Sequence, residues 1–593
     1  MTQVTRLFDL LPHYAEKYRP KEDVIAGKEN GEWKRYSINS YREFADAISY
    51  ALINSGIGKG DMVATIMTSR PEWNFIDMGI MQTGAVHVPV YPTISESDYK
   101  YILNHAGVKI LFISGKDIFR KIEHILPEVP SVSAVYSIKP TEGTGLYADF
   151  VEIGRKNPSP GELEKRKAAV DPGDLATLIY TSGTTGSPKG VMLTHVNLLS
   201  NVKAVAYIPP VGEEGRAVSY LPLCHVYERM LNYVYQYTGI SVYYAESVAT
   251  VVENMREVSP HILTTVPRLL EKVYDKIIAN GRKLKGVKKM IFFWAVNLGL
   301  QYEPEGGNGW FYHLKLKILD KLVFTKWRAA LGNDLRVIVS GGAALQPRLA
   351  RVFWAAGIPV LEGYGLTETS PVIAVNDFSK GGTLFGSVGR IISGVEVKIA
   401  GDGEILARGP NIMSGYYKEP RLTSEAIDAD GWFHTGDIGK IENGGQLKIT
   451  GRKKEIFKTS LGKYISPELI ENKFKESPFI DSLIVMGENQ KFAAALVIPD
   501  FNHLRSWCAI KEVPYTTDAE MINLPRIRKR FQVEIDKFNK FFGATEQVKR
   551  FELLDHEWTV DSGELTASLK LRRTYICEKY GDKIKKIFNI EEN

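Results

Sequence analysis

The stretch at residues 180–190 reads "YTSGTTGSPKG" and combines three glycines with threonines, serines and one lysine. The residues just before it, 174–180, are apolar and partly β-branched, which favours a buried strand. Glycines let backbone N–H groups approach a ligand closely, and hydroxyl groups and Lys189 offer donors to phosphate oxygens. The stretch therefore predicts a polyphosphate-binding loop that follows a strand.

This loop differs from the common nucleotide-binding motif G-x-x-x-x-G-K-[ST]. Ser187 and Pro188 separate Gly186 from Lys189, and Gly190 stands where a metal-binding serine or threonine belongs. A single glycine-rich loop is also compatible with an ordinary flexible turn. The density of threonine, serine and lysine within eleven residues favours phosphate binding.

The composition is that of a globular protein. The chain has 593 residues, of which 44% are hydrophobic and 24% charged, and this length implies more than one domain. The formal net charge of +6 is mild and gives no reason to expect a nucleic-acid partner. Cys224, Cys508 and Cys577 lack ligand-like spacing, so we expect a reducing compartment, no disulfide framework and no structural zinc.

The N-terminal residues lack a basic start followed by a long apolar core, so we expect no signal peptide. No apolar run approaches the length of about 18–20 residues that spans a bilayer. We therefore expect a cytoplasmic protein that is soluble or peripheral to the inner surface of a membrane.

Helix and strand patterns alternate through about residue 370, which predicts an α/β layered architecture. Residues 37–56 read as a helix, and residues 61–69 and 86–93 read as strands. From residue 386 the pattern changes. Apolar and polar residues alternate on both sides of Gly-Asp-Gly in residues 395–409, which predicts a hairpin. Residues 446–452 read as a strand.

The last part of the chain predicts a separate α+β domain. Ser466 stands at the N-cap and Pro467 at the first position of a helix, on which Ile470 and Phe474 share one face. Residues 482–500 read as a hairpin. The predicted organisation is an N-terminal domain with α/β subdomains over 1–385 and a small β-rich subdomain over 386–451, followed by a C-terminal domain over 452–593.

Five further stretches carry polar and glycine residues between apolar segments. They include His225, the pair Gly341-Gly342, Glu368, Asp437 and a basic cluster that begins at Arg452. They are "YLPLCHVYERM" (220–230), "VIVSGGAAL" (337–345), "LEGYGLTETSP" (361–371), "GWFHTGDIG" (431–439) and "GRKKEIFKTSLGKYISPELIE" (451–471).

Together these motifs resemble the adenylate-forming superfamily, in its order and approximate spacing, from about residue 30 to about 575. Within it the chain looks most like the long-chain fatty-acid–CoA ligases, because of "LPLCHVYER", "VPRLLEKVYDKI" (266–277), the long segment that follows, and "GELTASLKLRR" (563–573). One departure is Ala567, which replaces the usual proline. Leu569 stands where the wider superfamily has glycine, as is normal for this branch.

The resemblance implies a reaction in two halves. A fatty carboxylate attacks the α-phosphorus of ATP, giving acyl-AMP and pyrophosphate, and the CoA thiolate then displaces AMP. The fatty carboxylate is already ionised at pH 7, so the first half needs alignment and charge stabilisation rather than a general base. The expected co-substrates are ATP, CoA and a fatty acid, with Mg²⁺ as the metal.

The resemblance also assigns roles to individual residues. Lys570 becomes the adenylation lysine, although the residues alone read it as a surface lysine in a basic patch. His225 is expected to position the acyl carboxylate, with a core histidine as the alternative. Lys454 becomes a hinge about which a mobile C-terminal domain rotates.

The other expected ligands divide into three groups. The residues expected to bind phosphate are Thr181, Ser182, Gly183, Thr184, Thr185, Gly186 and Lys189. The expected metal ligands are Thr184 and Glu368, of which Glu368 is a hard oxygen donor. The residues expected to line the adenosine site and the acyl entrance are Gly342, Ala343, Glu362, Gly363, Tyr364, Gly365, Thr367, Asp437 and Arg452. Plain backbone packing, a turn aspartate and a solvated arginine are the alternatives within the last group.

Residues 281–300 are basic and then apolar, with five lysines and arginines before Met290. Such a segment can rest on an anionic lipid surface, and a core helix with a solvated basic flank is the alternative. Two other functions stay open: a fatty acyl-AMP ligase that delivers to a carrier protein, and a non-catalytic acyl- or nucleotide-binding protein. Both a monomer and a homodimer are compatible with the sequence.

Overall fold

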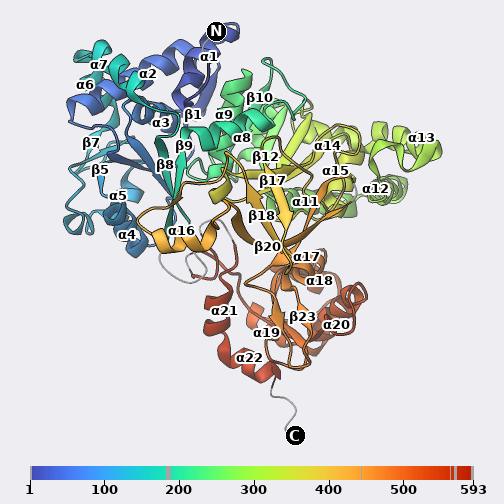
Figure 1. Cartoon of the computed structure of the whole chain (residues 1–593). Helices are drawn as coiled ribbons and strands as arrows, with labels where there is room; N and C mark the ends of the chain where they lie inside the picture. Colours follow the sequence, from blue (N-terminus) through green and yellow to red (C-terminus); the bar gives the residue numbers. More distant parts are fainter. Residues whose placement is uncertain (1–2, 182–187, 443, 561, 567–569, 589–593) are drawn as a thin grey trace.

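The computed structural model describes residues 3–181, 188–442, 444–560, 562–566 and 570–588. Two large sheets with helices around them form the upper body, and a smaller part built from the last residues of the chain lies below it (Figure 1). The chain is therefore mixed α/β, as the alternating sequence pattern predicts.

The first sheet has eight strands and a largely parallel core. Its strands at 62–66 and 86–90 are buried along their whole length, which confirms the strands predicted at 61–69 and 86–93. Its order is β19 (Gly415–Tyr416), β9 (Lys189–Thr194), β8 (Leu175–Thr181), β4 (Val86–Val90), β3 (Met62–Ile66), β5 (Val108–Ile113), β6 (Ala134–Ser137) and β7 (Gly145–Leu146).

The second sheet has thirteen strands and changes character along its width. It is parallel from β14 to β1 and antiparallel from β14 outward to β17. Its order is β17 (Glu396–Ile399), β18 (Glu404–Arg408), β20 (Phe433–Glu442), β21 (Gln446–Arg452), β16 (Arg390–Ile391), β15 (Val372–Val375), β14 (Val360–Gly365), β13 (Val337–Ser340), β12 (Ile262–Thr265), β10 (Arg216–Ser219), β11 (Ser241–Tyr244), β1 (Ile25–Glu29) and β2 (Glu32–Tyr36).

The segment predicted as a β-rich subdomain, 386–451, does contain the expected hairpin, β17–β18, and the strand β21. Its strands nevertheless continue the thirteen-stranded sheet through the pairing of β16 with β15. Part of the segment also leaves that sheet, because β19 pairs with β9 of the other sheet. The segment therefore joins the two sheets rather than forming a sheet of its own.

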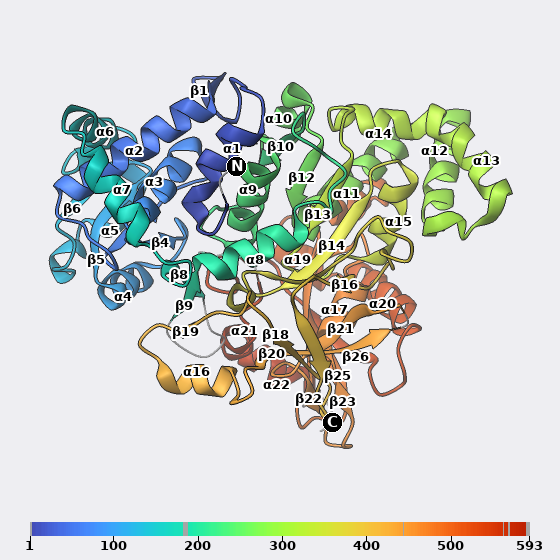
Figure 2. The ribbon, with the colours of Figure 1, turned by 45° about the horizontal axis from the view of Figure 1, so that its top comes forward.

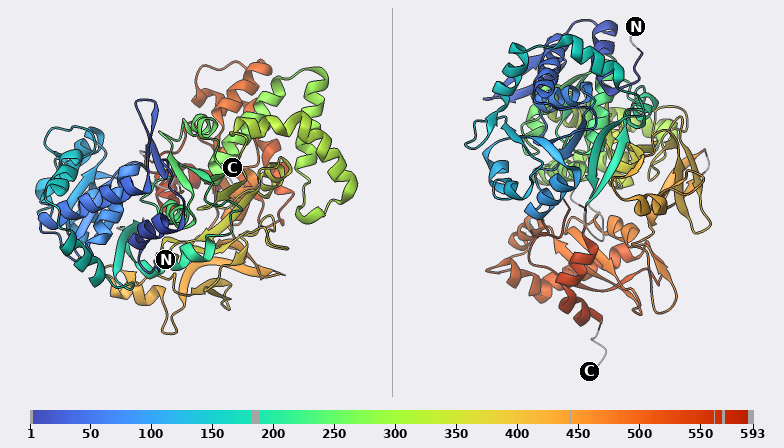
Figure 3. Two further views of the ribbon diagram at one scale, coloured as in Figure 1. Left: turned by 90° about the horizontal axis from the view of Figure 1, so that it is seen from above. Right: turned by 60° about the vertical axis from the view of Figure 1, so that its left-hand side comes forward.

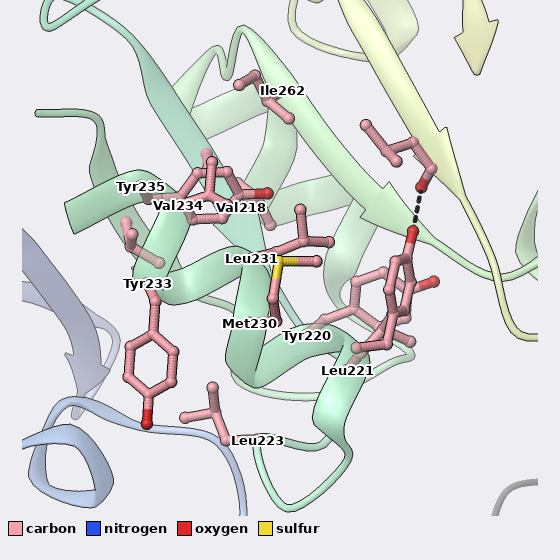
Figure 4. Packing of buried hydrophobic residues seen from close by; sticks show 14 of the residues in the cluster. Val218, Tyr220, Leu221, Leu223, Met230, Leu231, Tyr233, Val234, Tyr235 and Ile262 are labelled. Atoms are coloured by element: carbon pink, nitrogen blue, oxygen red, sulfur yellow. Dashed lines mark hydrogen bonds between the residues drawn. The ribbon is translucent and has the colours of Figure 1, made fainter. Parts of the chain in front are cut away.

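Two helices bridge the sheets: α8 (His195–Val205) packs on β9, and α9 (Val226–Thr238) packs on β11 and on α8. Figure 4 shows Met230, Leu231 and Val234 of α9 among apolar side chains of β10 and β12. The remaining helices of the upper body include α2, which confirms the helix predicted at 37–56. They are α1 (Leu10–Lys17), α2 (Ile38–Asn54), α3 (Pro71–Gln82), α4 (Glu96–Ala106), α5 (Lys116–Ile122), α6 (Tyr147–Lys156), α7 (Pro160–Ala169), α10 (Val251–Val258), α15 (Pro347–Ala355) and α16 (Pro420–Ala426).

The residues after Arg452 have a hydrophobic core of their own, and they lie below the sheets (Figure 3, right). The hairpin predicted at 482–500 is confirmed as β24–β25. The elements are β22 (Phe457–Lys458), β23 (Tyr464–Ile465), α17 (Pro467–Phe474), β24 (Ile480–Met486), β25 (Ala493–Pro499), α18 (Phe501–Ile510), α19 (Asp518–Asn523), α20 (Pro525–Asn539), β26 (Val548–Leu553), α21 (Arg573–Lys579) and α22 (Gly581–Phe588).

The start of α17 matches the predicted boundary but not the predicted cap. Ser466 occupies the N-cap position, yet its hydroxyl donates to the carbonyl oxygen of Thr450 at 2.9 Å instead of capping the helix. Ile470 and Phe474 are both buried, as their spacing predicts. The hydroxyl of Ser466 therefore ties the C-terminal part to the end of β21.

Helices between β12 and β13 project from the body of the molecule (Figure 2). None of the described helices is both long and apolar enough to cross a membrane. The elements between these strands are α11 (Pro267–Lys283), α12 (Gly286–Gly299), α13 (Gly309–Leu319), a π-helical turn (Asp320–Phe324) and α14 (Thr325–Ala330). Of these, α12 and α13 lie furthest from the sheets (Figure 2).

Candidate functional site

A cavity of about 2170 Å³ opens where parallel strands of both sheets end. Thr181 closes β8, Gly341 follows β13, and Gly365 closes β14; all three line the cavity. Ligands of α/β proteins bind beyond the carboxyl ends of parallel strands, because loops there converge and can be varied without disturbing the sheet. The position of the cavity thus follows from the topology.

The cavity collects every expected site residue that the structure describes, from segments spread over about 390 residues of chain. Ser182, Gly183, Thr184, Thr185 and Gly186 lie outside the described residues. The described residues on the cavity wall are Thr181, Lys189, His225, Gly342, Ala343, Glu362, Gly363, Tyr364, Gly365, Thr367, Glu368, Asp437, Arg452, Lys454 and Lys570.

Asp437 lies at the centre of a polar group on this wall. The Tyr364 hydroxyl donates to Asp437 Oδ2 at 2.7 Å, and Arg452 Nε lies 3.6 Å from Asp437 Oδ1. Asp437 and Arg452 face each other across β20 and β21, so the sheet register fixes their separation. Burial raises the pKa of Asp437, whereas Arg452 and the Tyr364 hydrogen bond act to lower it. The carboxylate is well placed to accept hydrogen bonds from a pair of adjacent hydroxyls.

Glu368 stands on a second part of the wall, held by an aromatic neighbour. The Tyr416 hydroxyl donates to Glu368 Oε1 at 2.9 Å, and Lys189 Nζ lies 5.1 Å from the centre of the Tyr416 ring. Tyr416 belongs to β19, which pairs with β9, the strand that begins at Lys189. Carboxylate oxygen is the ligand that Mg²⁺ prefers, so Glu368 fits a metal site; the second expected ligand, Thr184, is not among the described residues.

Lys570 reaches the same cavity from the C-terminal part of the chain. Its side chain faces the cavity, and the cavity walls shield the ammonium from bulk water. This desolvation is the main reason that the pKa of Lys570 is lowered, and the charge of Arg452 is the second. The carboxylates of Asp437, Glu368 and Glu468 act in the opposite direction. A lysine in this position carries positive charge into a space between the two carboxylate-bearing walls.

His225 is the N-cap residue of α9, where its Nδ1 accepts a hydrogen bond from the backbone N–H of Tyr227 at 3.2 Å. Burial, and then the charge of Lys570, lower its pKa to about 4. The ring is therefore neutral at pH 7 and suited to hydrogen bonding rather than to carrying charge. The ring also caps α9, and this is a structural role of the kind that the sequence left open as the alternative.

Beyond His225 the cavity wall becomes apolar. Four of the apolar lining residues lie on α9, and others lie at the end of α8, just after it, or on β13 and β15. A long hydrocarbon chain gains roughly 0.8 kcal/mol for each methylene that it buries. The apolar lining residues include Val205, Ile208, Val226, Met230, Leu231, Val234, Val339 and Val372.

The glycines of 337–345 and 361–371 shape the wall between these regions. Gly342 has a φ of +80°, and a Cβ on Gly365 would lie 1.6 Å from the carbonyl oxygen of Pro371. Both positions therefore need glycine. Glu362 accepts a hydrogen bond from the backbone N–H of Leu345 at 2.9 Å, and burial raises its pKa to about 8. This carboxyl is protonated at pH 7 and ties the two loops together.

Lys454 lies in an exposed turn directly after β21, between the sheets and the core of the C-terminal part. Its neighbour Lys453 pairs with Asp402 at 2.6 Å and Glu404 at 2.8 Å, and its N–H donates to the carbonyl of Gly436 at 2.8 Å. Lys453 is thus bound to the upper body. The exposed Lys454 follows it directly, where the chain enters the C-terminal part.

Sequence reasoning missed two polar residues of the cavity. Tyr416 contacts Glu368 only because β19 leaves its neighbours and joins the other sheet. Glu468 lines the cavity from the first turn of α17, where burial raises its pKa. Tyr416 stands outside the stretches quoted above. Glu468 belongs to the stretch 451–471, and the available signal for it was its place in the first turn of the helix predicted there.

Residues 11–417 match the family model described as AMP-binding enzyme. The chain belongs to this family. Among curated relatives, a long-chain-fatty-acid–CoA ligase, FadD15, from Mycobacterium bovis is 34% identical, over 95% of this chain and 94% of that protein. A peroxisomal long chain acyl-CoA synthetase 7 from Arabidopsis thaliana is 32% identical, over 99% and 87%.

The fold is shared with solved structures of low sequence identity. The adenylation domain of a carboxylic acid reductase from Segniliparus rugosus, in complex with AMP and a carboxylic acid, superposes with a TM-score of 0.75 at 18% identity, over 99% of this chain and 95% of that one. The anthranilate CoA ligase AuaEII in complex with anthranoyl-AMP gives a TM-score of 0.73 at 18% identity, over 98% of each chain. These likenesses confirm the predicted fold class.

Proposed function

We propose that this AMP-binding enzyme converts a long-chain fatty acid, ATP and CoA into acyl-CoA, AMP and pyrophosphate. The observation that carries the proposal is one cavity that joins the polar group of Asp437, Glu368 and Lys570 to an apolar wall along α9. A carboxylate and a nucleotide fit the polar end, and a hydrocarbon chain fits the apolar end. The relatives named above carry the same activity in their names.

In the first half-reaction a carboxylate oxygen forms a bond to the α-phosphorus, and the bond from the α-phosphorus to the pyrophosphate oxygen breaks. Asp437 accepts hydrogen bonds from the ribose hydroxyls, and Arg452 lies beside it. Lys570 donates to the carboxylate and to the α-phosphate as negative charge shifts toward the leaving group. Lys189 and the loop at 181–186 hold the leaving pyrophosphate.

Thr184 and Glu368 are the residues that would hold Mg²⁺. The bound metal neutralises phosphate charge. Tyr416 fixes the orientation of Glu368 through the 2.9 Å hydrogen bond. In the second half-reaction the thiolate of CoA bonds to the acyl carbon, and the bond from that carbon to the AMP oxygen breaks. The hinge at Lys454 would let the C-terminal domain withdraw Lys570 between the two halves.

The test is an assay of products. The purified chain is incubated with ATP, Mg²⁺ and fatty acids of graded length, with and without CoA, and AMP, pyrophosphate and thioester are measured. Stoichiometric AMP, pyrophosphate and acyl-CoA, all dependent on long-chain fatty acid, support the proposal. Acyl-AMP that accumulates and is not consumed by CoA would point to a fatty acyl-AMP ligase that serves a carrier protein. No AMP under any condition would contradict an enzymatic role.

Several expectations about partners stay predictions. They are the cytoplasmic location, contact with a membrane through residues 281–300, and assembly into a homodimer. No nucleic-acid partner is proposed, in keeping with the mild net charge of the chain.

A further inference from the structure

The helices that project between β12 and β13 carry an unusual share of the exposed apolar surface. Among the described residues, 22 large hydrophobic side chains are exposed, and nine of them lie within residues 284–322. Trp310 is 69% exposed and Phe311 is 62% exposed, and the centroids of their stacked rings lie 3.8 Å apart. Contiguous exposed apolar surface marks an interaction site. The nine are Leu284, Val287, Met290, Trp294, Trp310, Phe311, Leu314, Ile318 and Leu322.

The exposed residues follow helical spacing. Phe311, Leu314, Ile318 and Leu322 recur at intervals of three and four along α13 and the π-helical turn, so they form one stripe. Val287, Met290 and Trp294 form a second stripe on α12 in the same way. The other side of α12 is buried on α15, whereas the side chains of its stripe are exposed in the part of the chain that the structure describes.

The charge around the stripes is strongly positive. Residues 281–330 hold ten lysines and arginines against three acidic residues. All three acids have partners other than these lysines: Asp320 pairs with Arg328 at 2.6 Å, Glu303 pairs with Arg351 at 2.7 Å, and Glu305 accepts from a backbone N–H. Within the part of the chain that the structure describes, eight of the lysines form no ion pair: Lys283, Lys285, Lys288, Lys289, Lys315, Lys317, Lys321 and Lys326.

We propose that α12, α13 and the π-helical turn form a docking surface for an anionic lipid bilayer. Lysines beside an apolar stripe keep their ammonium groups at the headgroups while the stripe enters the acyl region. Tryptophans such as Trp294 and Trp310 favour that boundary. A second copy of the chain fits poorly, because a two-fold interface would bring the same unpaired lysines face to face.

The surface lies close to the cavity, although the inference does not depend on the proposed function. The hairpin of α12 and α13 projects from the body in three views (Figures 1–3). The helix on which it packs, α15, supplies Arg348 and Arg351 to the cavity wall. An apolar substrate dissolved in the bilayer would thus meet the protein one helix away from its site.

The experiment measures co-sedimentation of the full chain with vesicles of phosphatidylcholine alone or mixed with phosphatidylglycerol, at low and high salt. We expect binding to the anionic vesicles that weakens with salt. The variant K315E/K317E/K321E should bind at least about tenfold more weakly, since each lysine near a bilayer contributes on the order of 1 kcal/mol. F311S/L314S should also weaken binding, and at either salt concentration.

The matched control is Ile510→Ser, which removes a 77% exposed side chain at the end of α18, outside the proposed docking surface; its binding should equal that of the wild type. Circular dichroism checks that each variant is folded. Wild-type protein that stays in solution with anionic vesicles overturns the proposal, and so does equal binding of the wild type and the hairpin variants. Light scattering that shows a dimer lost in F311S/L314S, without vesicle binding, assigns the face to a second copy and also overturns it.

Discussion

At the scale of single residues, the cavity brings opposite charges together: Arg452 pairs with Asp437, whereas among the described residues Lys570 pairs with no carboxylate. Lys570 is influenced by Arg452, Asp437, Glu368 and Glu468, yet the structure gives it no ion pair within the described residues. Desolvation therefore makes the ammonium costly to keep charged when the cavity is empty, and its lowered pKa reflects that cost. A bound nucleotide and carboxylate would supply the missing negative charge, so the site is arranged to gain most from its ligands.

The first prediction at this scale concerns Lys570→Ala. We expect ATP–pyrophosphate exchange to fall by about 10²–10³, the usual effect of removing one donor to developing charge. Thioester formation from supplied acyl-AMP should be nearly unchanged, because the proposed hinge at Lys454 would turn the C-terminal domain away for that step. Lys549→Ala, at an exposed lysine of β26 in the same domain, is the control. Equal loss of both half-reactions would contradict this division of labour.

The positions of single residues on the cavity wall were predictable from the sequence where motifs surround them, and their roles stay predictions. Glu368 and Asp437 stand in glycine-rich stretches, and Lys570 in a basic one, and all three line the cavity. Tyr416 was not predictable, because its contact with Glu368 depends on a strand pairing between residues more than 220 positions apart. Local sequence carries no record of such a pairing.

At the scale of elements, strands and helices with regular patterns were predictable and their neighbours were not. The hairpins β17–β18 and β24–β25 and the helix α2 follow from alternation and periodicity over short stretches. The assignment of 386–451 to a separate β-rich unit missed that β16 joins β15, because edge pairing depends on which backbone groups remain unpaired elsewhere. Patterns within a strand do not specify that partner.

An ion pair between two elements gives a second prediction. Arg268 of α11 pairs with Asp481 of β24, and this contact joins the upper body to the C-terminal part while Lys570 lines the cavity. Both side chains are partly exposed, so the pair contributes about 0.2–1 kcal/mol. Asp481→Ala should therefore reduce ATP–pyrophosphate exchange by a factor of up to about five, by lowering the population of this orientation, and it should leave thioester formation from supplied acyl-AMP unchanged or faster.

The double variant Arg268→Asp/Asp481→Arg restores the pair with reversed charges and should recover most of the exchange rate. Asp518→Ala breaks the Arg505–Asp518 pair, which lies wholly within the C-terminal part, and should have no effect on either half-reaction. If D481A and D518A change exchange equally, the Arg268 contact does not select the orientation.

At the scale of the whole molecule, a buried polar network holds the two sheets together. Asp77 of α3 pairs with Arg229 of α9, accepts from the Tyr233 hydroxyl at 2.6 Å, and contacts His87 Nδ1 at 2.7 Å. Arg229 also donates to Thr177 of β8 at 2.6 Å. These side chains are fully buried and come from segments up to about 150 residues apart. No sequence pattern links them, because only the packed arrangement of α3, β8 and α9 brings their charges together.

The pH dependence of folding gives the last prediction, through Glu228 of α9. Burial raises the pKa of this carboxyl to about 8, and Ser219 and Asn232 only partly offset the effect. Among the described residues its Oε2 has no hydrogen-bond partner, which fits a neutral acid. Between pH 4.5 and about 8 the folded protein therefore holds a proton that the unfolded chain releases. This group alone lowers the free energy of unfolding by up to about 1.4 kcal/mol per pH unit as pH rises.

The variant Glu228→Gln cannot titrate at this position. The unfolding free energy of the upper body, followed by urea denaturation from pH 5 to 8, should therefore fall less steeply with pH than in the wild type. The exposed Glu123→Gln serves as control and should keep the wild-type slope; parallel profiles for E228Q and the wild type would mean that Glu228 is ionised in the folded protein.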